Sequence, residues 1–214
     1  MKTQTTIFAS ILLVLIALLA GAFLWDKLPQ QMASHWDVND QVNGTMPRLW
    51  GVLLMPLISI GLLALFIAIP TIDPLKENIA DFKPSFNIFI FLMIAFFLYV
   101  HALTLAWNLG IMKSGMGMMI TPAIGLLFIA VSRMVSVAKR NYFIGIRTPW
   151  TLASDEVWDK THALGGKLFA VAGVITLLGV FAPTVAYPLL IISVLGATVI
   201  TTVYSYVIFQ KIAK

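Results

Sequence analysis

The chain has 214 residues, of which 60% are hydrophobic and 11% are charged, whereas an average soluble domain has about 25% charged residues. These values exclude a disordered chain and an ordinary cytosolic enzyme, and they indicate a polytopic membrane protein. The absence of cysteine excludes a disulfide, a thiolate nucleophile and a cysteine-based zinc site. The net charge is +5, but no run of basic residues resembles a nucleic-acid arm, so we expect no direct nucleic-acid partner.

Uncharged apolar stretches long enough to cross the hydrocarbon layer follow one another along the chain. The first four cover residues 7–25, 49–70, 87–110 and 115–132. A fifth stretch, residues 168–209, is too long for one helix, and the segments Ala182-Pro183-Thr184 and Tyr187-Pro188 favour a break into two. The sequence therefore predicts an all-α integral membrane protein with six transmembrane helices.

The positions of lysine and arginine predict the orientation of these helices, because cytoplasmic loops carry an excess of both. With the N-terminus in the cytosol, the outer segments hold only Lys27, Arg48 and Lys113. We therefore expect both termini to be cytosolic. The eleven lysines and arginines assigned to the inside are Lys2, Lys76, Lys83, Arg133, Lys139, Arg140, Arg147, Lys160, Lys167, Lys211 and Lys214.

The first apolar stretch has two readings. Lys2, the apolar run from Ile7 and the segment Ala20-Gly21-Ala22 resemble a cleavable signal peptide. The run continues to Trp25, which favours a membrane anchor with this tryptophan at the outer interface. Cleavage of residues 1–22 would leave the remaining topology unchanged, so the charge bias leaves both readings open.

Two long loops divide the chain loosely in two. Residues 1–110 hold three predicted helices and an outer loop at 26–48, and residues 111–214 hold three predicted helices and an inner loop at 139–161. Irregular backbone in membrane proteins is kept mainly where it has a function. We therefore look for candidate site residues in these loops first.

The outer loop contains an Asn43-Gly44 pair, which predicts a turn within a small hairpin or a segment lying on the membrane. His35, Asp37 and Asp40 are candidate metal ligands, but one histidine and two carboxylates on a loop are weak evidence for a metal site. We expect instead an ordered outer cap with Trp36 at the membrane interface and no metal. Such a cap is compatible with binding of an external ligand.

The inner loop contains signals for a defined backbone. Gly145 permits a turn, and Thr148 should be extended because it precedes proline. Ser154 is a good N-cap for a helix that runs into the fifth span, on which Trp158 and His162 lie one turn apart and can touch. The glycines that would let a neighbouring helix approach this one closely are Gly165, Gly166 and Gly173.

Composition leaves two readings of the inner loop open. In the first, the loop re-enters the interface, its aromatic residues lie among the headgroups, and Arg147 pairs with phosphate or with Asp155. In the second, the loop is a cytosolic platform that holds a ligand or partner. The aromatic residues concerned are Tyr142, Phe143, Trp150 and Trp158.

The third predicted span carries three polar residues, Asn87, His101 and Asn108. They share one helix face, because intervals of 14 and 7 residues drift by only about 60° in total. Such residues usually hydrogen-bond across helices inside the bundle. A proton or ion pathway is the alternative, since an ionisable residue at membrane depth is a functional candidate, but no deep carboxylate is available to pair with His101.

The inner-loop residues form a recognisable signature. The segment 141–152 (NYFIGIRTPWTL), followed by Val157-Trp158, His162 and Gly165-Gly166, closely resembles the signature of the SdpI family of bacterial membrane immunity proteins. The outer segment, with Leu28-Pro29, His35-Trp36, Gly44 and then Pro56, is similar to the DUF1648 domain that often precedes it. Together the two resemblances cover nearly the whole chain.

The resemblance implies a protein of the bacterial cytoplasmic membrane that protects against a secreted antimicrobial peptide toxin by binding it. In the founding system of the family, the toxin-bound membrane protein also retains a transcriptional repressor at the membrane. The partners to expect are therefore the toxin, membrane lipids and a cytosolic repressor. The candidate binding residues are Arg147, Thr148, Pro149, Trp150, Trp158 and His162 on the inside and His35, Trp36 and Asn39 on the outside.

Two other functions compete with immunity. A small transporter or channel would need a continuous polar path along the face of Asn87, His101 and Asn108. A membrane enzyme would need catalytic groups, but the sequence lacks an H-E-x-x-H motif, a phosphate-binding P-loop and a G-x-S-x-G elbow. We therefore expect neither catalysis nor a cofactor.

Overall fold

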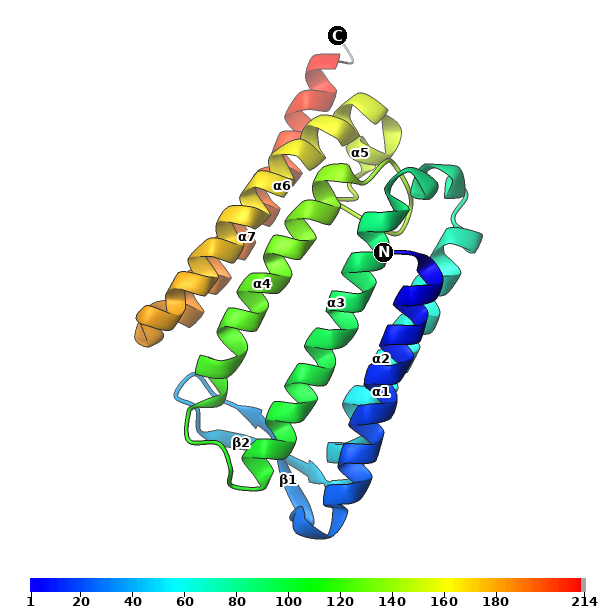
Figure 1. The fold of residues 1–214 in the computed structure, drawn as a ribbon. Helices are drawn as coiled ribbons and strands as arrows, with labels where there is room; N and C mark the ends of the chain where they lie inside the picture. Colours follow the sequence, from blue (N-terminus) through cyan, green and yellow to red (C-terminus); the bar gives the residue numbers. More distant parts are fainter. Residues whose placement is uncertain (213–214) are drawn as a thin grey trace.

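The computed structural model describes residues 1–212, apart from the side chains of Pro183 and Thr184. Within this part of the chain, six helices are long and apolar enough to cross a membrane, which confirms the prediction of an all-α membrane protein. They run side by side in an elongated bundle (Figure 1). Their bounds are α1 (Thr3–Leu24), α2 (Arg48–Ile72), α3 (Lys76–Asn108), α4 (Met116–Val137), α6 (Asp155–Leu178) and α7 (Pro183–Ile212).

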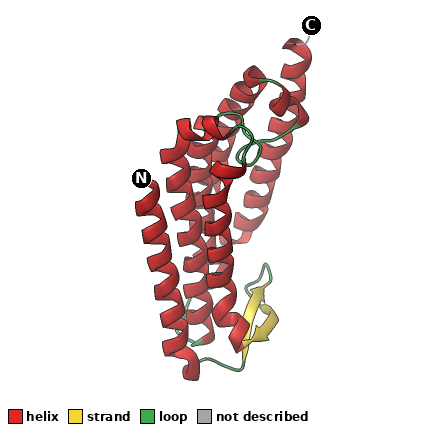
Figure 2. Cartoon of the chain, turned by 90° about the vertical axis from the view of Figure 1, so that its right-hand side faces the viewer, coloured by secondary structure: helices red, strands yellow, loops and turns green. Residues whose placement is uncertain are grey.

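The shorter elements lie at the two ends of the bundle. A hairpin of β1 (Gln31–Trp36) and β2 (Val42–Pro47) follows the 3-10 turn η1 (Trp25–Lys27) at one end. The short helix α5 (Pro149–Ala153) lies at the other end, together with the start of α1 and the end of α7 (Figure 2). We call these the hairpin end and the terminal end. The predicted outer and inner loops are therefore at opposite ends, while Lys214 lies outside the described residues.

The break between the last two spans is narrower than the sequence suggested. The 3-10 turn η2 (Gly179–Phe181) ends α6, and α7 begins at Pro183. Pro188 lies inside α7, so the prediction that the Tyr187-Pro188 segment helps to break the chain was wrong. A proline inside a helix removes one backbone hydrogen bond, but transmembrane helices tolerate it because neighbouring groups satisfy the freed carbonyl.

Small residues bring α4 and α6 into close contact, as the glycines of the fifth span predicted. A Cβ atom added to Gly173 would lie 2.8 Å from the carbonyl oxygen of Gly125 in α4. A Cβ atom added to Gly166 would overlap the Ser136 side chain. Because apolar burial gives no driving force between helices in lipid, this close backbone approach is a main source of helix association.

One buried apolar cluster joins the two halves of the chain. It contains Val14 of α1, Leu63 of α2 and Phe86 of α3, and it continues through Met134 of α4 to Trp158 of α6. The halves predicted from the two loops therefore share a core, and the loops at both ends are attached to one packed body.

Replacing Gly173 with alanine should destabilise the bundle, because the new methyl group meets backbone atoms of α4 that have no room to move. We expect a loss of about 1–3 kcal/mol and a lower midpoint in thermal unfolding of the detergent-solubilised protein. Gly196→Ala is the matched control, since a Cβ atom there meets nothing within 4 Å. Equal midpoints for the two variants would contradict the proposed α4–α6 contact.

The orientation of the bundle can be tested with single cysteines, because the chain has none of its own. We expect Asn39→Cys in the hairpin to react with a membrane-impermeant maleimide in intact cells. We expect Lys211→Cys at the terminal end to react only after the cells are opened. The reverse pattern of labelling would show that the charge bias predicts the wrong orientation.

Candidate functional site: the inner loop and the outer hairpin

The inner loop is organised around the side chain of Asn141, which is completely buried. Its carbonyl oxygen accepts hydrogen bonds from the backbone N–H groups of Phe143 (2.9 Å) and Ile144 (2.6 Å). Its amide nitrogen donates to the carbonyl oxygens of Lys139 (2.8 Å) and Ile144 (2.9 Å). One side chain thus replaces the partners that a helix or sheet would give this backbone. In the sequence, Asn141 stood out only as part of a motif, and its role as a centre of backbone hydrogen bonds was not predicted.

His162 and Trp158 of α6 support the second part of the loop. Both are buried, and their rings stack with a centroid distance of 4.0 Å. Nε2 of His162 accepts a hydrogen bond from the N–H of Ile146 at 2.9 Å. Nδ1 lies 2.8 Å from the carbonyl oxygen of Trp158, so the hydrogen bonds assign a neutral ring with its proton on Nδ1.

The loop needs a glycine at position 145 because its backbone packs closely on the ring of His162. Gly145 has φ +114°, and a side chain there would overlap the imidazole ring of His162. The Nε1 atom of Trp158 donates to the carbonyl oxygen of Ala138 at 2.8 Å, which fixes the end of α4 against α6. The predicted turn at Gly145 and the predicted contact of Trp158 with His162 are confirmed. Both rings are buried, however, and support the loop from beneath instead of offering a binding surface.

The short helix α5 was not expected from the sequence, where only the extended conformation of Thr148 and the cap at Ser154 were predicted. Both predictions are confirmed, since Thr148 has φ −114° and ψ 163° and Ser154 caps α6. The side chain of Thr148 accepts a hydrogen bond from the N–H of Thr151, and the Thr151 hydroxyl accepts one from the N–H of Thr148. The Thr148 hydroxyl also lies 3.0 Å from the Ser205 hydroxyl of α7. The two reciprocal hydrogen bonds cap the start of α5. The contact between the Thr148 and Ser205 hydroxyls attaches α5 to the last helix.

The inner loop also contacts the segment between α2 and α3. Asp73 at the end of α2 is buried, and its carboxylate accepts hydrogen bonds from the N–H groups of Leu75 (2.6 Å) and Tyr142 (2.9 Å). Asn78 of α3 donates to the carbonyl oxygen of Arg140 at 2.7 Å. Nothing in the sequence pattern paired these distant residues, so Asp73 and Asn78 were missed.

Arg147, Pro149 and Trp150 are the predicted inner residues that remain accessible. Nη1 of Arg147 donates to the carbonyl oxygen of Tyr142 at 2.6 Å, which leaves most of its donors open. Phosphate and Asp155 were the two alternative partners expected for Arg147 in an interfacial loop, and the second is wrong, because Asp155 pairs with Arg140 at 2.7 Å. Arg140 is closer because it also donates to the carbonyl oxygen of Leu152 beside the start of α6.

A pair of packed aromatic rings borders the accessible side of the inner loop. The Trp150 side chain is partly buried, and the centroid of its ring lies 5.1 Å from the ring centroid of Tyr206 in α7. A tryptophan held in this way offers rigid apolar contact area at low cost in conformational entropy. We call Arg147, Pro149 and Trp150 the inner surface.

The outer hairpin turns earlier than predicted. Asn43 and Gly44 lie within β2, and Gly44 pairs with His35 of β1, so the prediction of a turn at this pair was wrong. The carboxylate of Asp37 accepts hydrogen bonds from the N–H groups of Asn39 (2.8 Å) and Gln41 (2.9 Å). Such an aspartate turn competes successfully with an Asn-Gly pair.

Three contacts fix the hairpin on the bundle. Asp40 has φ 59°, and its carboxylate accepts a hydrogen bond from the N–H of Gly117 at the start of α4 (2.7 Å), where the helix dipole favours a negative charge. Asn108 of α3 pairs with both backbone groups of Ala33, at 2.7 and 3.0 Å. The ring of Trp36 packs edge-on against Trp107 at 5.6 Å, so this tryptophan is held by α3.

The side chains proposed as metal ligands have other partners. Asp37 and Asp40 accept the backbone hydrogen bonds described above, and Nδ1 of His35 contacts the Oδ1 atom of Asn43. Within residues 1–212, no three histidine, aspartate or glutamate side chains are grouped so that they could hold a metal ion. His35 and Asn39 are exposed on the hairpin, where an external ligand can reach them.

The three polar residues of α3 have separate partners. Asn87 donates to the carbonyl oxygen of Met1 and the hydroxyl of Thr3, both at 3.1 Å, and so attaches the start of α1. Asn108 holds the hairpin at the other end. His101 is buried between them, and neither of its ring nitrogens has a hydrogen-bond partner among the described residues. The buried apolar side chains that separate Asn87 from His101 include Ile90, Ile94 and Leu98.

Comparison with known proteins identifies both regions. Residues 137–205 match the SdpI/YfhL protein family, and residues 12–60 match a domain of unknown function, DUF1648. The chain carries an SdpI-family region. Over 204 residues, which are 95% of each chain, it is 26% identical to a protein of Bacillus subtilis (strain 168) named "Immunity protein SdpI". No solved structure matches the chain. The protein is a multi-pass protein of the bacterial cytoplasmic membrane.

The SdpI-family region contains the whole inner loop together with α5, α6 and most of α7. Its motif residues form one connected unit in the structure, in which Asn141, Thr148, Trp158 and His162 are buried and Arg147 is exposed. The buried members hold the backbone, and the exposed members are free to contact another molecule.

Replacing Asn141 with alanine should open the inner loop, because the N–H groups of Phe143 and Ile144 lose their acceptor. The N–H of Ile144 is buried, and leaving such a group without a partner costs about 1–3 kcal/mol. In inside-out vesicles, we expect trypsin to cut after Arg140 and Arg147 much faster in this variant than in the parent. Asn39→Ala in the exposed outer turn is the control. An unchanged cutting rate for Asn141→Ala would show that this side chain does not order the loop.

Proposed function

We propose that this protein is a membrane immunity protein that protects its cell against a secreted antimicrobial peptide by binding the peptide. The observation that carries the proposal is the likeness to Immunity protein SdpI, which extends over 95% of both chains. A match of this extent includes the outer hairpin, all six spans and the inner loop. It therefore supports a common function more strongly than a shared motif alone would.

The geometry of the inner surface supports binding. Arg147 presents a planar group of donors that suits a carboxylate or phosphate, and Trp150 adds fixed apolar area beside it. Arginine and tryptophan are the residue types that contribute most often to binding energy at interfaces. Because the loop beneath them is held by buried hydrogen bonds, a ligand need not spend binding energy on ordering it.

The hairpin supports a contribution from the opposite side of the membrane. It is fixed on α3 and α4 through Asn108 and Asp40, and it exposes His35, Asn39 and the apolar side chain of Val38. A secreted peptide would meet this surface first if the predicted orientation is correct. We propose that the hairpin receives the peptide, that the inner surface is also needed for protection, and that the inner surface can in addition contact a cytosolic partner, such as a repressor.

Transport and catalysis have less support. The polar groups of α3 are separated by buried apolar side chains, and two of the three hold neighbouring backbone. The relative is named for immunity and not for a reaction. We therefore propose a protein that acts by binding, without a catalytic step and without a cofactor.

A protection assay tests the proposed function. The chain is expressed in a sensitive bacterium and challenged with a panel of secreted membrane-active peptides. We expect it to raise survival against at least one peptide. We expect Arg147→Ala and Trp150→Ala to reduce protection at least tenfold, because they remove the accessible donors and the fixed aromatic ring.

Lys160→Ala is the matched control for this assay. Lys160 is an exposed cation at the same end of the bundle, and its ion-pair partner within residues 1–212 is Glu156 on its own helix. Membrane levels of all variants are compared by immunoblot. The absence of protection by a parent chain that reaches the membrane would contradict the immunity proposal, and full protection by both inner-surface variants would remove the inner surface from it.

A further inference from the structure

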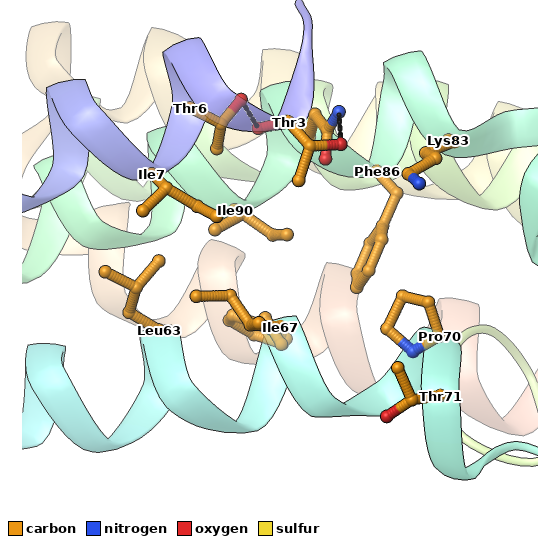
Figure 3. A pocket seen from close by; sticks show the side chains of 12 residues that line it. Thr3, Thr6, Ile7, Leu63, Ile67, Pro70, Thr71, Lys83, Phe86 and Ile90 are labelled. Carbon is orange, nitrogen blue, oxygen red and sulfur yellow. Dashed lines mark hydrogen bonds between the residues drawn. The ribbon is translucent and has the colours of Figure 1, made fainter.

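A cavity of about 140 Å³ lies between α1, α2 and α3 near the terminal end. Figure 3 shows its lining side chains, with Ile7 from α1, Leu63 from α2 and Ile90 from α3 toward one end. Thr71 and Lys83 lie toward the other end, near Phe86 and Pro70. The cavity is thus apolar at its deeper end and polar where the helices approach the membrane surface.

The polar groups at the surface end are already bonded to the protein, except for one charge. The Thr71 hydroxyl donates to the carbonyl oxygen of Ala68, and Asn87 donates to Thr3. Lys83 is the one charged residue among those that line the cavity. None of the ion pairs among residues 1–212 involves it. Its ammonium group is therefore available to an anion.

The apolar wall of the cavity includes an accessible side chain. Ile67 lines the cavity and is 42% exposed, and we take this residue of α2 to mark an opening of the cavity toward lipid. An apolar cavity of about 150 Å³ stays free of water and accepts an apolar molecule the size of benzene. Within a bilayer, the apolar material next to such an opening is a lipid acyl chain.

We infer that this cavity binds an acidic membrane phospholipid, with part of one acyl chain between α1 and α2 and its phosphate beside Lys83. A zwitterionic lipid would bring its own cation close to Lys83, so the site should favour an acidic headgroup. A single lysine near the membrane surface gives a preference of about fivefold for an anionic lipid. The bound lipid would hold α1 against the bundle. This inference does not depend on the proposed immunity function.

Native mass spectrometry of the purified full chain tests this inference. The detergent-solubilised protein is titrated with phosphatidylglycerol and with phosphatidylcholine that carries the same acyl chains. We expect the parent to bind the first phosphatidylglycerol about fivefold more tightly than the first phosphatidylcholine. Lys83→Gln should remove this preference, and Ile67→Trp, which fills the opening from a half-exposed position, should weaken the first binding step for both lipids.

Lys76→Gln is the control, since it removes an exposed lysine from the same end of α3 that does not line the cavity. This variant should keep the preference for phosphatidylglycerol. Equal affinity of the parent for the two lipids would overturn the inference, and so would an equal effect of the two lysine variants. If Ile67→Trp leaves lipid binding unchanged, the lipids bind elsewhere and the inference is also wrong.

Discussion

Irregular backbone that is buried inside a membrane protein must find hydrogen-bond partners within the protein, because an unpaired N–H or C=O group is costly there. The segment between α4 and α5 meets this constraint through side chains. Asn141 makes four hydrogen bonds to the backbone around it, and His162 accepts one from Ile146. Trp158 closes the unit by donating to the end of α4. The position of the inner surface depends on these buried contacts.

The same helices connect the two ends of the molecule. The hairpin is attached to the end of α3 and the start of α4 through Asn108 and Asp40. The inner loop is attached to the end of α4 and to the start of α3 through Trp158 and Asn78. A ligand that shifted the hairpin would therefore act on two helices that also hold the inner loop. This arrangement gives a binding event at the hairpin a physical route to the inner surface at the opposite end of the bundle.

Hydropathy was sufficient to predict the six spans, because each span contains a long and strongly apolar run. Local signals at Gly145, Thr148 and Ser154 also predicted the backbone of the inner loop correctly. The turn of the hairpin was misplaced, since the Asp37 side chain competes with the Asn43-Gly44 signal and only the folded geometry shows which prevails. Partners distant in sequence, such as Asp73 with Tyr142 and Arg140 with Asp155, could not be predicted. The inner-loop motif was recognisable in the sequence. The sequence did not show which of its residues are buried and hold the backbone of the loop.

The central claim is that the inner loop is ordered before any ligand binds, and amide hydrogen exchange in lipid nanodiscs tests it most directly. The N–H groups of Ile144 and Ile146 donate to buried side-chain acceptors, so they should exchange orders of magnitude more slowly than an unstructured peptide in the ligand-free protein. The N–H of Val38, which is 73% exposed in the outer turn, provides the internal fast reference. Exchange of Ile144 and Ile146 as fast as this reference would show that the loop is mobile, and it would contradict a preformed inner surface.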